Sequence, residues 1–226
     1  MYLVIPAAGK GSRFVEAGYT TPKPLLPLKD GTPMIAGVVR DCLLAFPDIK
    51  AVIIGAPSEY ITSVMKAVSV WHGMVRVVAF DEVTRGAAET VLRLIEGLPD
   101  APVVIANSDQ AFSSLDVKPR LRPNAGVCLT FGPDDSTKWS FLVDGTIVEK
   151  PDVAPVNGVK TIGVYAWGSV ARLRADIASM IAENERHGPN QEFYLAPVMN
   201  RLDAIINLPV ESFTALGTPE DYEAAQ

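Results

Sequence analysis

Residues 5–27 read IPAAGKGSRFVEAGYTTPKPLLP, in which a short apolar run leads into a loop rich in glycine and basic residues. Gly9 and Gly11 can adopt positive φ angles and let the backbone come close to phosphate oxygens. Three cationic side chains occur in the same segment: Lys10, Arg13 and Lys23. Prolines on both sides of Lys23 stiffen the chain around its ammonium group. The stretch therefore predicts a strand that runs into a loop suited to hold a triphosphate.

The spacing of this loop differs from both common phosphate-binding fingerprints. A Walker loop needs GxxxxGK[ST] and a dinucleotide-binding fold needs GxGxxG, whereas residues 9–13 read GKGSR and the next lysine is Lys23. An ordinary β-to-α turn with solvated basic side chains is the alternative for the Gly-Lys-Gly run taken alone. Arg13, the PKPLLP run and the GTPMI segment at 31–35 together favour the phosphate site.

Composition and hydrophobic pattern predict a folded α/β protein. The chain has 226 residues, of which 48% are apolar and 20% charged, so it can bury a substantial core and is not a disordered protein. Short apolar runs without alternation recur, as is typical of strands buried on both faces of a mostly parallel sheet. They occupy residues 2–5, 51–55, 75–80, 103–106 and 126–131.

Amphipathic helices are predicted between these runs. Apolar residues with i, i+3, i+4, i+7 spacing follow Ser58, a candidate N-cap, and a second such helix ends before Gly97. The apolar positions are Ile61, Val64, Met65 and Val68 in the first helix and Ala88, Val91, Leu92 and Ile95 in the second. The order β-α-β-α-β-α-β over residues 1–110 predicts a nucleotide-binding half.

The pattern changes in residues 111–226. Residues 139–143 and 146–149 predict a hairpin around Asp144-Gly145, followed by a strand at 160–167 and a helix over 170–186. We expect acceptor-binding elements here. Because no linker separates the halves, the expected fold is one domain, 1–226, with a doubly wound, mostly parallel mixed sheet and helices on both faces.

The charge balance and the cysteines exclude several classes of protein. A net charge of −6 argues against broad nucleic-acid binding, and a local basic pocket in an acidic protein fits a small phosphorylated ligand. Cys42 and Cys128 stand in apolar stretches, and their spacing supports neither a disulfide scaffold nor a zinc site. Neither a leader pattern nor a run of about 18 apolar residues occurs, so we expect a cytoplasmic protein without membrane insertion.

Asp109 stands just beyond the predicted strand 103–106. In an open α/β sheet, ligands bind at the carboxyl ends of the strands, where the GKGSR loop is also expected. Mg²⁺ needs only one or two protein carboxylates when a triphosphate supplies the other oxygen ligands. Taken alone, Asp109 would more readily be interpreted as the cap of a helix or turn. Its expected place beside the loop favours the metal.

These motifs resemble the signature of the nucleotidylyltransferases that make nucleotide sugars and related activated phosphates, roughly AxGxGxR…PKPLLP. Small members from capsule and surface-polysaccharide biosynthesis are especially similar. The resemblance implies a nucleotide-diphospho-sugar transferase-like fold, and it places the catalytic Mg²⁺ on Asp109. The nucleotide-binding residues are then Ala7, Ala8, Gly9, Lys10, Gly11, Ser12, Asp81, Glu82, Gly86, Ala87 and Ser108.

Residues 85–90, RGAAET, begin a predicted helix and resemble the G-x-A segment with which this family selects the nucleotide. Small residues at a helix N-terminus let a base and ribose pack on backbone, although a tight helix–sheet contact would require them equally. Asp81 and Glu82 lie just upstream. A carboxylate only accepts hydrogen bonds, so it suits the amino group of cytosine and favours CTP over UTP or dTTP.

Glu149-Lys150-Pro151 resembles the family's EKP segment, whose lysine contacts the phosphate of the acceptor. Lys150 would screen the attacking phosphate while Arg13 and Lys23 hold the triphosphate. By itself, such a Glu-Lys pair at a hairpin end is usually solvated. These three cations are the predicted catalytic residues, and Glu149 is predicted to bind the acceptor together with Lys150.

Two later segments complete the comparison with the family. Glu192 and Tyr194 are predicted to line the acceptor pocket with Phe193, unless the two aromatic residues belong to the core. Residues 216–222, LGTPEDY, resemble the family's DxGTPEDY, but Ala215 stands where many members have a second metal-binding Asp. Either Asp109 and triphosphate oxygens hold the metal, or Glu192 or Glu211 substitutes, or activity is reduced.

The implied reaction joins an NTP to a phosphorylated small molecule, first of all a sugar 1-phosphate, and releases pyrophosphate. The acceptor oxygen attacks the α-phosphorus in line, and no covalent enzyme intermediate is required. Other functions stay open: a cytidylyltransferase for phosphocholine or a phosphorylated amino acid derivative, a GT-A type glycosyltransferase, and an inactive nucleotide-binding regulator. The long β-helix extension of bifunctional relatives is not present in the sequence, so a single activity is expected.

Overall fold

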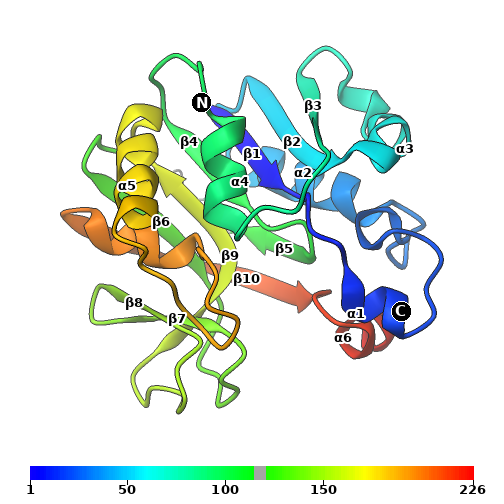
Figure 1. Ribbon diagram of the computed structural model, residues 1–226. Helices are drawn as coiled ribbons and strands as arrows, with labels where there is room; N and C mark the ends of the chain where they lie inside the picture. The colour runs from blue at the N-terminus through cyan, green and yellow to red at the C-terminus, as the bar shows by residue number, and fades with distance from the viewer. Residues whose placement is uncertain (115–120) are drawn as a thin grey trace.

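The computed structural model describes residues 1–114 and 121–226, in which one 10-stranded mixed sheet runs through both halves of the sequence. The strand order is β3-β2-β1-β4-β9-β6-β10-β5, and a hairpin of β7 and β8 joins at β9 (Figure 1). Helices cover both faces of the sheet. The predicted doubly wound α/β fold with a mixed sheet is therefore confirmed.

The first four strands along the chain are parallel and form one side of the sheet. They are β1 (Tyr2–Pro6), β2 (Ala51–Pro57), β3 (Val75–Phe80) and β4 (Val103–Ala106). All four are paired in the order β3-β2-β1-β4. β4 is fully buried, as its unbroken apolar sequence predicts, because helices pack on both of its faces. Their carboxyl ends all point to one edge of the sheet.

The second half adds strands that are largely antiparallel. They are β5 (Gln110–Ser114), β6 (Ala125–Thr130), β7 (Ser140–Val143), β8 (Thr146–Glu149), β9 (Val159–Trp167) and β10 (Ala204–Ala215). β9 pairs antiparallel with β4 and β6, and β10 runs parallel to β6 and antiparallel to β5. The predicted β7–β8 hairpin is confirmed, and Asp144 and Gly145 both have positive φ at its turn.

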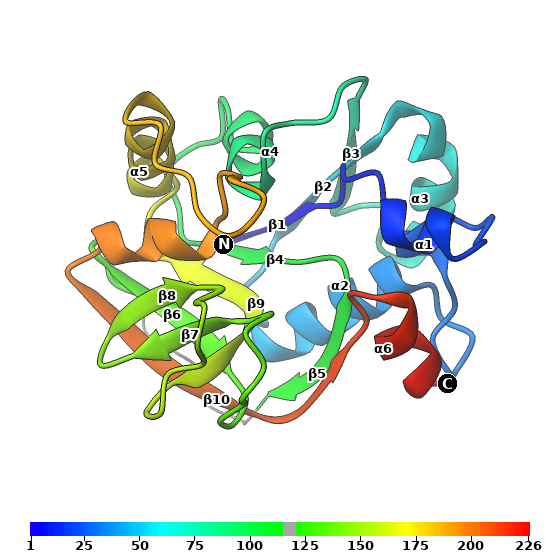
Figure 2. The same ribbon diagram turned by 60° about the horizontal axis from the view of Figure 1, so that its bottom comes forward.

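The helices form two layers. α4 (Ala87–Leu94) and α5 (Val170–Ala182) pack on one face of the sheet, and α2 (Met34–Ala45) and α3 (Ile61–Ala67) pack on the other. In Figure 2, α4 and α5 lie above the sheet and α2 lies below it. Each layer buries its own apolar cluster, so the sheet is the shared wall of two cores.

Two predicted helix boundaries are wrong. Ser58 is not the N-cap of α3, because it begins a 3₁₀ turn and its hydroxyl donates to Asp81. α3 begins at Ile61 instead. α5 ends at Ala182, four residues earlier than expected, where Asn184 takes a left-handed backbone with φ of 52° and turns the chain away.

A third, small apolar cluster fastens the two ends of the chain to each other. α1 (Ser12–Glu16) contributes Phe14, and α6 (Pro219–Ala224) contributes Tyr222, whose ring lies edge-on to Phe14 at 6.2 Å. Tyr19 packs edge-on against both rings. The C-terminal segment is thereby held against the GKGSR loop.

Short 3₁₀ helices connect several elements: η1 (Lys23–Leu25), η2 (Ser58–Tyr60), η3 (Ser69–Trp71) and η4 (Ala196–Arg201). Cys42 and Cys128 are free and buried, and burial raises the pKa of both thiols. Within residues 1–114 and 121–226, the helices are all too short or too polar to cross a membrane.

Candidate active site

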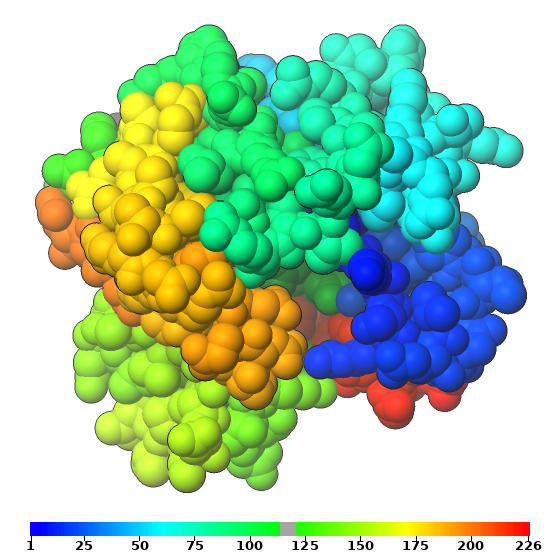
Figure 3. All heavy atoms as spheres, viewed as in Figure 1, coloured from blue at the N-terminus to red at the C-terminus, as the bar shows by residue number. Residues whose placement is uncertain are grey.

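A cavity of about 220 Å³ opens beyond the carboxyl end of β4, and residues from both halves of the chain line it. Figure 3 shows the hollow between the N-terminal segment in blue, the α4 region in green and the segment after α5 in orange. Six of the predicted site residues lie on its wall: Arg13, Ala87, Asp109, Glu149, Lys150 and Tyr194. Residues separated by up to about 180 positions therefore meet where the sheet topology predicts a ligand.

Lys23 and Asp109 form an ion pair beside this cavity. The Lys23 Nζ lies 2.6 Å from the Asp109 Oδ2 and also donates to the Gly217 carbonyl at 3.2 Å. Their side chains are only 15% and 27% exposed, so water screens the pair less than it would on the surface. Lys23 begins η1 between two prolines, and Asp109 follows β4. The structure thus brings a predicted triphosphate cation and the predicted metal ligand into direct contact.

The GKGSR loop forms part of a second cavity, of about 170 Å³, which lies between the loop and α3. Predicted residues that line it are Ala7, Gly9, Lys10, Gly11, Lys23 and Ser108. Gly11 requires its glycine, because its φ is 61°. A Cβ on Gly9 would meet no atom within 4 Å, so open space adjoins its backbone. That space is available to a ligand that approaches the loop.

Lys150 and Glu149 are not a solvated surface pair. The Lys150 Nζ donates to the Tyr194 hydroxyl at 2.9 Å and lies 4.1 Å from the centre of the Tyr194 ring. The Glu149 Oε2 accepts from the Ser140 hydroxyl at 2.6 Å. Burial raises the pKa of Glu149, although the Ser140 hydrogen bond and Lys150 oppose that shift. Both side chains are therefore ordered by the protein on the cavity wall.

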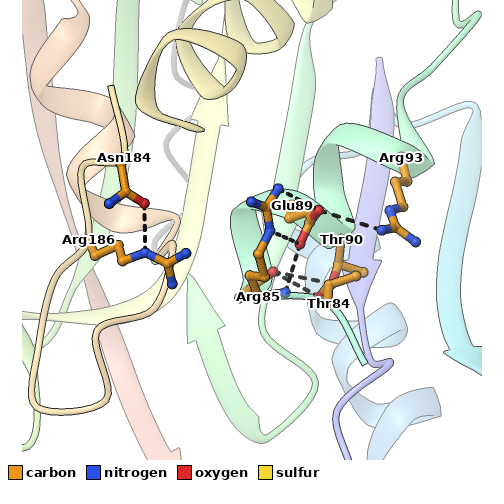
Figure 4. Close-up of polar contacts among 8 residues, drawn as sticks. Thr84, Arg85, Glu89, Thr90, Arg93, Asn184 and Arg186 are labelled. Atoms are coloured by element: carbon orange, nitrogen blue, oxygen red, sulfur yellow. Dashed lines mark hydrogen bonds and ion pairs between the residues drawn. The ribbon is translucent and has the colours of Figure 1, made fainter. Parts of the chain in front are cut away.

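The two predicted aromatic residues after α5 have different environments. Tyr194 lines the cavity, whereas Phe193 is fully buried in the core. The Phe193 ring contacts the guanidinium groups of Arg85 and Arg186 at 5.1 and 4.4 Å from its centre. Figure 4 shows Arg85 held by Glu89, with Arg186 on the neighbouring segment. Phe193 thus belongs to the core, and the acceptor role of Tyr194 on the cavity wall stays a prediction.

Some predicted residues lie outside both cavities. Asp81 and Glu82 are exposed, and Asp81 accepts a hydrogen bond from the Ser58 hydroxyl at 2.6 Å. Ala8, Ser12, Gly86 and Glu192 likewise do not line either cavity, and neither does Glu211. At Gly86, with φ of 147°, a Cβ would come within 2.5 Å of the Phe193 carbonyl oxygen. Close backbone packing therefore requires this glycine.

Asp109 is the one predicted metal ligand on the cavity wall. Among the described residues, no three His, Cys, Asp or Glu side chains group closely enough to hold a metal by themselves. Ala215 also lines the cavity and contributes no ligand. A single carboxylate in an oxygen-rich site without imidazole or thiolate fits Mg²⁺ when triphosphate oxygens complete the coordination. The donor set therefore fits a metal that arrives with the nucleotide.

The structure adds residues that the sequence did not single out. Asp221 lines the cavity and pairs with Lys138, whose Nζ lies 3.0 Å from the Asp221 Oδ1. Asp221 belongs to the GTPEDY motif, and nothing in the motif alone shows that its carboxylate meets Lys138. Other additional wall residues are Asn107, Gln110, Trp139, Thr161, Tyr165 and Phe213. They come from the segment after β4, from β5, β9 and β10, and from the loop before β7, which share no local motif.

Comparison with known proteins adds a family to this geometry. Residues 3–186 match the family described as "MobA-like NTP transferase domain". A curated protein, the "bifunctional protein GlmU" of a Cyanothece species, is 27% identical over 227 residues. That match covers 93% of this chain and 47% of the relative, so the chain spans about half the length of that protein.

Solved structures share the fold at low sequence identity. A nucleoside-diphosphate-sugar pyrophosphorylase from Vibrio cholerae superposes with a TM-score of 0.82 at 22% identity, over 98% of both chains. A UDP-glucose pyrophosphorylase in complex with UDP-glucose gives 0.72 at 18% identity, over 99% of this chain and 96% of the other. A putative glucose-1-phosphate thymidylyltransferase from Bacillus anthracis gives 0.75 at 19% identity, over 100% and 93%.

Proposed function

The chain belongs to the family of MobA-like NTP transferase domains, and from this premise we propose which nucleotidyl transfer it performs. It is a nucleotidyltransferase that takes a Mg²⁺-bound NTP, CTP ahead of the other triphosphates, and a sugar 1-phosphate. It releases pyrophosphate and forms a nucleoside diphosphate-linked product. The observation that carries this proposal is the single cavity wall that holds Arg13, Asp109 and Lys150, with Lys23 paired to Asp109 at 2.6 Å.

The reaction needs charge neutralisation and alignment rather than a protein nucleophile. An oxygen of the acceptor phosphate forms a bond to the α-phosphorus of the NTP, and the bond from that phosphorus to pyrophosphate breaks. Arg13 and Lys23 neutralise the triphosphate as charge grows on the leaving group. Lys150 holds the acceptor phosphate on the opposite side. Mg²⁺ held by Asp109 would add positive charge to the phosphate oxygens.

The contact between Lys23 and Asp109 supports this assignment of charges. With a triphosphate bound, the ammonium group can turn to phosphate oxygens while the carboxylate takes the metal. Lys23 then pairs with phosphate instead of Asp109, and Asp109 pairs with the metal instead of Lys23. Neither charge is left buried without a partner. A cation and a carboxylate placed 2.6 Å apart are therefore suited to receive a metal–triphosphate pair together.

The proposed preference for CTP rests on two exposed acids, Asp81 and Glu82, that precede the Arg85–Ala88 turn. Asp81 is engaged by the Ser58 hydroxyl. Glu82 is thus the better candidate to accept from the cytosine amino group. A carboxylate that faces a carbonyl instead would leave two acceptors opposed, which disfavours uracil and thymine.

The choice of a sugar phosphate over phosphocholine rests on what covers the aromatic rings. A quaternary ammonium ligand needs an open aromatic face. Lys150 lies over the Tyr194 ring at 4.1 Å, and Lys138 lies over the Trp139 ring at 4.9 Å. These faces already carry cations of the protein. The Glu149 carboxylate, by contrast, can accept from sugar hydroxyl groups.

A panel of reactions tests the proposal. The protein is mixed with Mg²⁺, each of five NTPs, and sugar 1-phosphates, phosphocholine or phosphorylated amino acid derivatives, and pyrophosphate is measured. We expect release that depends on both substrates. Transfer of sugar from a ready-made nucleotide sugar would favour a glycosyltransferase, and nucleotide binding without turnover on any acceptor would favour a regulator.

A further inference from the structure

Lys150 is held in place by an aromatic side chain from a distant segment. Its backbone has φ of 42°, a conformation that turns the chain at the end of the β7–β8 hairpin. Its Nζ donates to the Tyr194 hydroxyl at 2.9 Å and lies over the ring at 4.1 Å. An ammonium group has three donors. Within the described part of the chain, the Tyr194 bond takes one of them and leaves two for ligand oxygens.

Tyr194 is in turn fixed by its surroundings. Gly188 has φ of 64°, and a Cβ there would lie 2.9 Å from the Cε2 of the Tyr194 ring. A glycine is therefore needed for the ring to occupy this place. The ring face that Lys150 covers is not open to an acceptor. Tyr194 thus contacts the lysine more directly than it can contact a substrate on that face.

The segment that carries Tyr194 is bonded to the turn that precedes α4. The Phe193 N–H donates to the Arg85 carbonyl at 3.1 Å, and the Ala88 N–H donates to the Phe193 carbonyl at 3.0 Å. Gly86 lies against the same backbone. This turn is the segment expected to meet the nucleotide. The nucleotide side and the acceptor lysine are therefore connected by two consecutive residues.

Charged side chains fasten this connection from outside. The guanidinium groups of Arg85 and Arg186 contact the Phe193 ring, and Arg186 also donates to the Gln191 carbonyl at 2.9 Å. The Glu89 carboxylate forms ion pairs with both Arg85 and Arg93 (Figure 4). The buried ring and its cations keep residues 191–194 close to the turn.

We infer that Tyr194 is a positioning residue that aims the Lys150 ammonium at the acceptor phosphate, with residues 191–194 anchored on the Arg85–Ala88 turn. This inference rests on the proposed nucleotidyl transfer. Tyr194 acts through Lys150 and makes no bond of its own to the reacting atoms. The anchor sets the position of the acceptor lysine relative to the nucleotide.

A double-mutant cycle tests the first part. Tyr194→Phe keeps the ring and removes the hydroxyl, and we expect kcat/KM for the acceptor to fall about tenfold while the KM for NTP is unchanged. Lys150→Met should cost more. In the Lys150→Met background, Tyr194→Phe should cost nothing further, because its partner is gone. Tyr2→Phe is the matched control, because Tyr2 lies at the amino end of β1, away from the cavity, and this variant should behave as wild type.

Two results would overturn this part. Fully additive losses would mean that Tyr194 binds the acceptor independently of Lys150. An unchanged kcat/KM in Tyr194→Phe would mean that the hydroxyl has no positioning role.

The anchor is tested at Arg186, which lies outside the cavity wall. Arg186→Met removes the guanidinium from the Phe193 ring and from Gln191, and we expect the acceptor KM to rise about threefold, a loss typical of one exposed contact. The NTP KM should not change. Arg76→Met, an exposed arginine on β3, is the control. Identical acceptor kinetics in the Arg186 and Arg76 variants would refute the anchor.

A readout without turnover separates this inference from the proposed function. If no acceptor yields pyrophosphate, the proposed function fails. The contact is then measured by ¹³C NMR of reductively methylated lysines, with the Lys150 signal identified by its loss in Lys150→Arg. The tyrosine ring should shift that signal upfield, and Tyr194→Leu should abolish the shift. A Lys150 signal at the position of a solvated lysine would overturn the inference.

Discussion

At the scale of single residues, the site contains two pairs of opposite charge formed by the protein's own side chains. Lys23 pairs with Asp109 and Lys138 pairs with Asp221, each at the edge of the same cavity. The Lys23–Asp109 pair is the more buried of the two, so loss of one partner would leave the other charge poorly compensated. A ligand that brings its own phosphates and metal can exchange with these pairs. The same charges can therefore be stable in the free protein and act on a substrate.

Removal of the triphosphate cations should abolish most of the activity. Lys23→Ala and Arg13→Ala should each lower kcat by about 100-fold or more, because both neutralise charge that develops on the leaving pyrophosphate. Circular dichroism and thermal melting should show an intact fold. Turnover near the wild-type rate in either variant would show that the triphosphate is held elsewhere.

Glu149 should give the stability of the protein a recognisable pH dependence. Burial raises its pKa in the folded state above the usual 4.5, so protonation favours folding. The protonated Glu149 carboxyl contributes to the free energy of unfolding fully below pH 4.5. This contribution is lost as the pH rises through the raised pKa of the folded state. Glu149→Gln should therefore increase the free energy of unfolding at neutral pH relative to wild type, and not at low pH.

Urea unfolding at several pH values measures this difference. Glu96→Gln, at an exposed carboxyl in the turn after α4, is the matched control and should leave the pH profile unchanged. A difference between wild type and Glu149→Gln that stays constant with pH would show that Glu149 does not titrate in this range.

At the scale of elements, the sequence predicts those helices, strands and turns that depend on local patterns of residues. The buried strands, α4 and the Asp144-Gly145 hairpin follow from apolar runs and turn residues, and all are observed. The GKGSR loop and Asp109 each follow a predicted strand, and this position is enough to predict that they lie at the same edge of the sheet. Local pattern could not show that Phe193 enters the core while Tyr194 meets Lys150. That division depends on a contact across more than 100 residues with the Arg85–Ala88 turn.

The same contact makes a prediction for Gly86. Gly86→Ala should destabilise the protein by about 1–3 kcal/mol, because its Cβ would lie 2.5 Å from the Phe193 carbonyl oxygen. Gly73→Ala is the control, since a Cβ there would meet nothing within 4 Å. Both are compared by urea unfolding. Equal stability of the two variants would show that residue 193 does not press on the turn.

At the scale of the whole molecule, one sheet carries the proposed nucleotide-binding and acceptor-binding elements side by side. The GKGSR loop, the Arg85–Ala88 turn and Asp109 follow β1, β3 and β4, and Lys150 follows β8 on the opposite part of the cavity wall. β9 pairs with β4 and joins the two sets. The chain has a net charge of −6, and the cations Arg13, Lys138 and Lys150 line the cavity, which suits a small phosphorylated ligand.

We expect base preference to depend on the two exposed acids that precede the Arg85–Ala88 turn. Competition among equal concentrations of CTP, UTP, dTTP, ATP and GTP should favour CTP, and Glu82→Gln should reduce that preference, because an amide can also donate to a carbonyl. Asp81→Asn should matter less, since Ser58 already occupies that carboxylate. A purine preference, or CTP selectivity that survives both changes, would assign base reading to backbone groups.

We propose that Mg²⁺-NTP and a phosphorylated acceptor react at the Asp109 cavity. ³¹P NMR of the complete reaction with CTP and a set of sugar 1-phosphates tests it most directly. We expect pyrophosphate and a new diphosphate diester to appear in equal amounts with wild type, and neither with Asp109→Asn at the same Mg²⁺ concentration. If the spectrum of each NTP stayed unchanged with every acceptor, or if Asp109→Asn turned over at the full rate, the proposal would be contradicted.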